Sequence, residues 1–113
     1  MRTLNDYFLT CHIDNISSAN DIWVAVPDGG KVIKVMSAIS AAISGADATI
    51  TVSANGASMG SFAIPNSGSA QGDVATLIPA SNNEVQEGDS IQVATDGAST
   101  GTVDAMFTIV IRR

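Results

Sequence analysis

The chain has 113 residues, of which 45% are hydrophobic and 14% are charged. This is the length of one domain, and the composition excludes intrinsic disorder, which requires low hydrophobicity and high charge. Five basic and eleven acidic residues give a net charge of −6, which argues against binding to nucleic acid or to an anionic membrane surface, because both select basic patches.

Short runs in which apolar and polar residues alternate predict β-strands along the whole chain. Clusters of Gly, Asn, Asp and Ser separate these runs. This pattern is typical of an all-β, antiparallel β-sandwich of about eight strands, and it places one domain over residues 13–113. In chain order, the strands are expected at residues 7–13, 21–26, 31–36, 48–53, 59–64, 74–78, 90–95 and 103–111.

The third run contains two irregularities. Lys31 and Lys34 would lie on opposite faces of a regular strand, and a bulge or bend near Lys34 would bring both into solvent. Residues 37–44 are rich in alanine, with Ile39 and Ile43 at helical spacing. This segment lacks clear capping residues, so we favour an extended continuation of the strand over a helix.

Two turns have specific sequences. Asn55 and Gly56 form the dipeptide most typical of a two-residue β-hairpin, because both positions need a positive φ. Gly88 can also adopt a positive φ, and Asp89 can accept hydrogen bonds from the backbone amides that follow it. We therefore expect structural turns at both sites.

The residues that could carry out chemistry are few. Cys11 and His12 are neighbours on a predicted strand, so their side chains point to opposite faces and cannot form a nucleophile–base pair. A single cysteine excludes an internal disulfide bond and a cysteine-based zinc site. The aspartates are scattered singly, several of them beside glycines, which favours a role in turns over calcium binding. We expect no catalytic residues, no metal and no cofactor.

The C-terminal third carries a more specific pattern. Residues 85–93 (VQEGDSIQV), an open turn, and residues 106–111 (MFTIVI) look like the closing strands of jelly-roll β-sandwiches. With the turn at residues 27–30, the hairpin at residues 55–56 and the loop at residues 68–73, the chain resembles the small capsid decoration (cement) proteins of tailed bacteriophages over roughly residues 13–113.

The resemblance implies a jelly-roll-like fold and a structural role. Such proteins bind the outside of the expanded icosahedral head, commonly as homotrimers, and hold neighbouring subunits of the major capsid protein together. They need no cofactor and catalyse no reaction. The resemblance therefore implies a virion protein of the capsid surface, made in the host cytoplasm, whose partner is the major capsid protein.

In such families an N-terminal arm often reaches across the shell. Residues 1–12 are the candidate arm, and Leu4, Tyr7, Phe8 and Leu9 would be its apolar contacts with the capsid or with another subunit. The alternative is that the same residues form the first strand of the sandwich. The sequence leaves both interpretations open.

Two other classes of function remain as alternatives. A virion- or fibre-associated module that binds host-surface carbohydrate would use Trp23 or the loop at residues 65–73. Sugar-binding sandwiches usually expose several aromatic rings, whereas this chain has one Trp and one Tyr, so we expect Trp23 to lie in the core. A hydrolase would require Cys11 or a serine to be reactive, and a serine would need His12, the only histidine of the chain, as its base.

Overall fold

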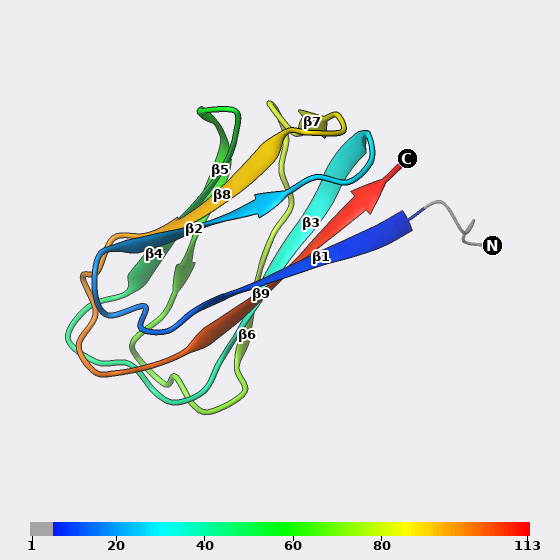
Figure 1. The fold of residues 1–113 in the computed structure, drawn as a ribbon. Coiled ribbons are helices and arrows are strands. Elements are labelled where there is room, and N and C mark those ends of the chain that lie inside the picture. Colours follow the sequence, from blue (N-terminus) through cyan, green and yellow to red (C-terminus); the bar gives the residue numbers. More distant parts are fainter. Residues whose placement is uncertain (1–5) are drawn as a thin grey trace.

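The computed structural model describes residues 6–113, which form two antiparallel β-sheets packed face to face (Figure 1). The first sheet has the strand order β1-β9-β3-β6, with the short β7 paired to β3, and the second has the order β2-β8-β4-β5. The predicted all-β sandwich is confirmed. The strands are β1 (Asp6–Ile13), β2 (Asn20–Ala25), β3 (Gly30–Ile39), β4 (Ala48–Ala54), β5 (Ala57–Ile64), β6 (Val74–Leu77), β7 (Glu84–Val85), β8 (Ser90–Thr95) and β9 (Ala105–Arg112).

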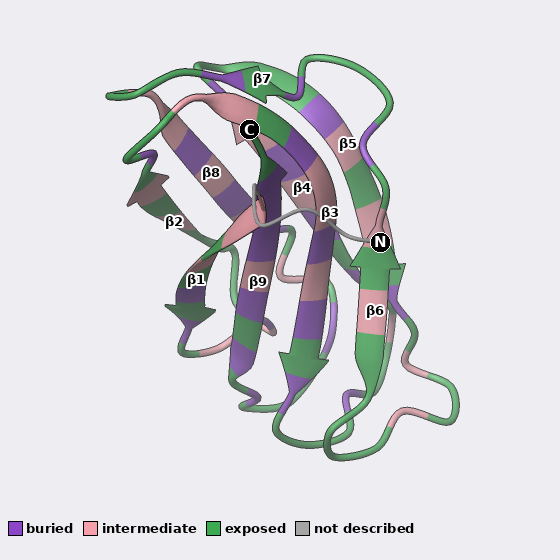
Figure 2. Ribbon diagram, turned by 90° about the vertical axis from the view of Figure 1, so that its right-hand side faces the viewer, coloured by how far each residue is buried: buried purple, intermediate pink, exposed green. Residues whose placement is uncertain are grey.

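The hydrophobic core lies between the two sheets. Alternate side chains of each strand point into this space, and Figure 2 shows the resulting bands of buried residues along β9 and β3. Most core residues are β-branched, which suits a pleated surface, and full burial of each stabilises the fold by about 1.5–3 kcal/mol. The core includes Val32, Val35, Ile50, Val52, Ile91, Val93, Phe107, Ile109 and Ile111.

The predicted bulge in β3 is confirmed. The pairing of β3 with β9 shifts register between Val32 and Lys34, so that Lys31 lies opposite Arg112 and Lys34 lies opposite Val110. On the other edge of β3, next to β7, the backbone of Val32 bonds to Asn83, a residue that the sequence did not single out. The Val32 amide donates to the Asn83 carbonyl, and the Asn83 side-chain amide donates to the Val32 carbonyl, both at 2.8 Å.

The segment after the bulge is extended, and residues 6–113 contain no helix. β3 continues to Ile39, so the favoured continuation was right up to that residue, but it ends before Ile43, which is buried in the loop that follows. The two-residue β7 was not predicted, because a pair of residues carries no alternation signal.

Both turns that the sequence singled out have left-handed backbone. Asn55 (φ 53°) and Gly56 (φ 84°) connect β4 to β5 with positive φ at both central positions, as this type of hairpin requires. Gly88 has φ 90°. The Asp89 carboxylate accepts from the amide of Gln86 at 2.9 Å, which lies before it in the chain, so the expectation that it bonds the following amides is corrected.

Candidate functional site

The predicted contact residues in the described part of the chain lie on both sides of β1. The segment from residue 6 to residue 12 forms a strand of the first sheet, paired with β9, and Leu4 lies outside the described residues. Tyr7 and Leu9 pack, half-buried, against the core. Phe8 points outward and is 61% exposed, so it is the one of these three that is placed to contact another molecule.

Phe8 belongs to a larger surface, the outer face of the first sheet, which we define as the outward side chains of β1, β9, β3 and β6. Antiparallel pairing aligns these side chains in rows across the strands. From one end to the other, the rows are Asp6, Arg112 and Lys31; then Phe8, Val110 and Lys34; then Thr10, Thr108, Met36 and Thr76; then His12, Met106, Ala38 and Val74.

The middle row of this face is uncharged, and large apolar side chains are exposed in the rows on either side of it. Phe8, Val74 and Met106 are among the exposed large hydrophobic residues, and Ile78 follows the end of β6 by one residue. Large contiguous apolar surfaces are rare on proteins that work alone. The sequence carried a signal for this surface that we did not use, since outward Met106 alternates with inward Phe107 along β9.

One end of the face is held by ion pairs. The Arg112 guanidinium binds the Asp6 carboxylate through two hydrogen bonds of 2.9 and 3.1 Å, and Arg113 Nη1 lies 2.7 Å from Asp28 Oδ2. The hydrogen bond from Arg113 and the amide of Gly29 lower the pKa of Asp28. The Tyr7 hydroxyl donates to the Asp28 carbonyl oxygen, so this end joins β1, β9 and the turn before β3.

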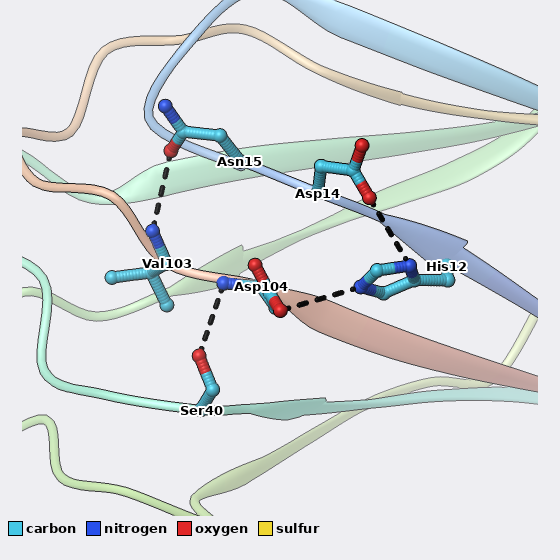
Figure 3. Close-up of polar contacts among 6 residues, drawn as sticks. All are labelled: His12, Asp14, Asn15, Ser40, Val103 and Asp104. Carbon is cyan, nitrogen blue, oxygen red and sulfur yellow. Dashed lines mark hydrogen bonds and ion pairs between the residues drawn. The ribbon is translucent and has the colours of Figure 1, made fainter.

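The opposite end of the face carries an acidic cluster (Figure 3). His12 Nδ1 lies 3.3 Å from Asp14 Oδ1, and His12 Nε2 lies 3.6 Å from Asp104 Oδ2. The Asp104 amide donates to Ser40 Oγ at 3.0 Å, which ties the start of β9 to the end of β3. His12 is flanked by carboxylates and points away from Cys11.

Cys11 is not suited to nucleophilic catalysis. Its side chain is buried, and burial raises the pKa of the thiol to about 11, so it is protonated at neutral pH. Nucleophilic cysteines are thiolates. His12 lies on the other face of β1, as alternation along the strand requires.

The aspartates of the described chain mainly hold turns. The carboxylates of Asp73 and Asp89 accept hydrogen bonds from the amides of Ala70 and Gln86, each three residues earlier. Within residues 6–113, no group of three or more His, Cys, Asp or Glu side chains is placed to hold a metal ion. The same residues include no helix long and apolar enough to cross a membrane.

The outer face of the second sheet carries mainly small or polar side chains, with one exception. Trp23, on the edge strand β2, is 56% exposed, so the prediction that it lies in the core is wrong. The inward positions of β2 are taken by Ile22 and Val24, and alternation then turns Trp23 outward. It lies opposite Gln92, whose side-chain amide donates to Asp21 Oδ2 at 2.8 Å.

No protein-family model matches the sequence, and no curated protein is detectably similar to it. Solved structures share its fold. A chain from the acidic stable capsid of Helicobacter pylori bacteriophage KHP30 is similar with a TM-score of 0.62 at 13% identity, over 96% of this chain and 87% of that one. A family 6 carbohydrate-binding module is similar with a TM-score of 0.59 at 11% identity, over 98% of this chain and 85% of the module.

A third neighbour is the glycoside hydrolase family 43 arabinoxylan arabinofuranohydrolase from Bacillus subtilis, with a TM-score of 0.64 at 16% identity. This similarity covers 90% of the present chain but only 21% of the enzyme. At such identities, these likenesses establish a shared β-sandwich fold and no more.

Proposed function

We propose that this chain is a structural virion protein that binds the outer surface of an expanded icosahedral phage head and stabilises contacts between subunits of the major capsid protein. The observation that carries the proposal is the outer face of the first sheet, which exposes Phe8, Met106 and Val74 around an uncharged middle and is suited to contact with another protein. The similarity to a phage capsid chain over most of both chains supports it.

The proposed mechanism is stabilisation by mass action. A protein that binds the expanded shell and not its precursor stabilises the expanded state in proportion to its occupancy and affinity. Single contacts can be weak, because many copies on a closed shell act together. In this proposal the chain needs no cofactor and catalyses no reaction.

The copy number in purified virions of its source tests this function. Quantitative mass spectrometry against the most abundant shell protein should give a fixed stoichiometric ratio set by lattice sites. A few copies per particle, or none, would contradict the proposal. Dissociation of the protein from intact heads should also lower the temperature at which the heads release their DNA.

Carbohydrate recognition by a virion- or fibre-associated module is the second candidate, and the exposed indole of Trp23 favours it. Aromatic rings on an accessible surface can stack on sugars, and Gln92 and Asp21 lie beside this ring with polar groups. The chain has one tryptophan, so its fluorescence reports on this site alone. Saturable quenching by oligosaccharides, lost on Gln92→Ala, would support carbohydrate binding.

A further inference from the structure

The first sheet is hollowed on both sides of β3, at the end where that strand finishes. On the side of β1 and β9 lies a first hollow of about 440 Å³, whose walls include His12, Ala38, Asp104 and Met106. On the side of β5 and β6 lies a second hollow of about 140 Å³. Ile39, the last residue of β3, lines both, so the two hollows adjoin.

The first hollow combines apolar walls with a carboxylate. Met106 and Ala38 are neighbours across β9 and β3, and both are exposed. The Asp104 amide is bonded to Ser40 Oγ (Figure 3), whereas within residues 6–113 its carboxylate has one polar contact, His12 Nε2 at 3.6 Å. That distance is too long for a hydrogen bond, so the Asp104 carboxylate can accept hydrogen bonds from another molecule.

The described chain does not supply a fixed positive charge to this hollow. A neutral imidazole has one N–H, and the two nitrogens of His12 face different carboxylates, those of Asp14 and Asp104. No lysine or arginine of residues 6–113 lies at this end of the sheet. Along β3, Lys34 precedes Ala38 by four residues, or about 13 Å. The first hollow therefore favours a cation that comes from a partner.

The second hollow is small, and its polar groups are already bonded. Ser69 and Asp73, the polar residues that line it, form hydrogen bonds with backbone groups of the chain. Its other walls are apolar side chains such as Ile64 and Val74. Apolar cavities of about 150 Å³ hold one small ring such as benzene, so this hollow fits one apolar side chain.

We propose that the two hollows receive an extended segment of the shell protein that carries a basic side chain and, close to it in sequence, an apolar one. Basic side chains lay their aliphatic stems on apolar surface and keep the charged head at a polar group, which matches Met106 beside Asp104. Arginine suits this site better than lysine, because a guanidinium donates two parallel hydrogen bonds to a carboxylate. The apolar side chain fills the second hollow.

This inference rests on the proposed function, and it names the chemistry of the partner at one end of the same face. Met106, Ala38 and Val74 belong to one row of the outer face of the first sheet, so the hollows continue the surface that would lie against the shell. Side chains that insert into hollows carry most of the binding energy of a protein interface. The two hollows would therefore fix the position of the shell protein on this face.

Binding to heads assembled without this chain tests the charge. The protein is titrated onto such heads, and the bound fraction is measured by co-sedimentation. Asp104→Asn keeps the shape of the first hollow and removes its charge, so it should weaken binding about tenfold and make the remaining affinity less dependent on salt. Glu87→Gln is the matched control, since Glu87 is exposed in the turn between β7 and β8, and it should bind like the wild type.

Filling the first hollow tests its shape without changing charge. Ala38→Leu places a larger side chain in the hollow, so it should weaken binding by about tenfold or more, although it adds apolar surface. Ala94→Leu makes the same change on the outer face of the second sheet and should leave binding unchanged. Thermal unfolding of every variant verifies that it folds.

The inference and the proposed function can fail separately. If Asp104→Asn binds heads as tightly as the wild type, or Ala38→Leu does, the inference is wrong, and the proposed function stands because the protein still binds. If the wild type does not bind heads at all, both are wrong. Loss of binding in Glu87→Gln or Ala94→Leu that equals the loss in the test variants also overturns the inference, because the effect would then not belong to the hollows.

Discussion

The outer faces of the two sheets differ, although the sheets share one core. The first face carries Phe8, Met36, Met106 and Val74 among threonines, with charges gathered toward its ends. The second presents small polar side chains such as Thr51 and Ser61, together with the exposed indole of Trp23. One face is therefore suited to burial against a protein, and the other to contact with water.

The difference shows that burial in a sandwich is not confined to the space between the sheets. Val110 points outward on the central strand β9, yet only 7% of its surface is exposed. Neighbouring long side chains cover it, because Phe8 and Lys34 flank it on the adjacent strands. On the second sheet, the outward residue Thr51 lies between Ala94 and Ser61, which are shorter, and it remains partly exposed.

A charge in the middle of each face tests this difference most strongly. Val110→Asp places an unpaired carboxylate in a covered position, and we expect it to lower the free energy of unfolding by about 3 kcal/mol or more. Thr51→Asp, on the second face, should cost about 1 kcal/mol or less. Urea unfolding of the monomer measures both. Equal losses in the two variants would mean that the two faces are packed alike.

The bulge in β3 is the next point at which to test the first face. It allows both Lys31 and Lys34 to lie on the outer side, and Asn83 bonds the backbone of Val32, the residue just before the shift in register, on the edge of β3 that faces β7. Asn83→Ala removes a buried side-chain hydrogen bond, so we expect a loss of about 1–3 kcal/mol in the free energy of unfolding. Asn66→Ala, at a partly exposed loop position, is the control and should change stability little.

The sequence predicted the bulge and every strand except the two-residue β7, because each of these depends on local alternation. The positions of Lys31 and Lys34 in one run required a bulge, and the structure contains one. The prediction that Trp23 lies in the core was wrong because it rested on the type of residue and not on its position in the strand. Between inward Ile22 and Val24, any side chain at that site points outward. The same alternation would have predicted the outward side of β9.

The interaction surface could not be predicted as a whole. It depends on which strands are neighbours, and β1, β9, β3 and β6 are distant in sequence. The role of Asn83 was hidden for the same reason, since its partner Val32 is 51 residues away. Side chains that meet through sheet order leave no signal in a single sequence.

A smaller effect is expected inside the sandwich, where Ser37 points inward between the sheets. Its hydroxyl is buried without a hydrogen-bond partner in the described structure. An unsatisfied buried polar group is destabilising, so Ser37→Ala should raise the free energy of unfolding by about 1 kcal/mol. Ser53→Ala, on the outer face of the second sheet, should have no measurable effect. A destabilised Ser37→Ala variant would show that the hydroxyl has a partner in solution.

The smallest effects concern two aspartates, one beside each sheet, that bond the ends of its strands by different means. Burial alone would raise the pKa of Asp96, but the amides of Ala98 and Thr49 donate to its carboxylate at 3.1 and 3.2 Å and lower it overall. Asp28 has its pKa lowered chiefly by Arg113. Both carboxyls are more acidic in the folded chain, so each stabilises the fold above its unfolded pKa of about 3.9.

These contributions disappear as the pH falls through the pKa of the folded state, and salt distinguishes them. Asp96→Asn and Asp28→Asn should each destabilise the protein at neutral pH and approach the wild type in strong acid. At about 1 M salt the effect of Asp28→Asn should shrink, because an exposed ion pair is screened. The effect of Asp96→Asn should persist, because backbone amides hold this carboxylate. Equal salt dependence of the two variants in chemical unfolding would mean that long-range charge, and not these local contacts, sets both pKa values.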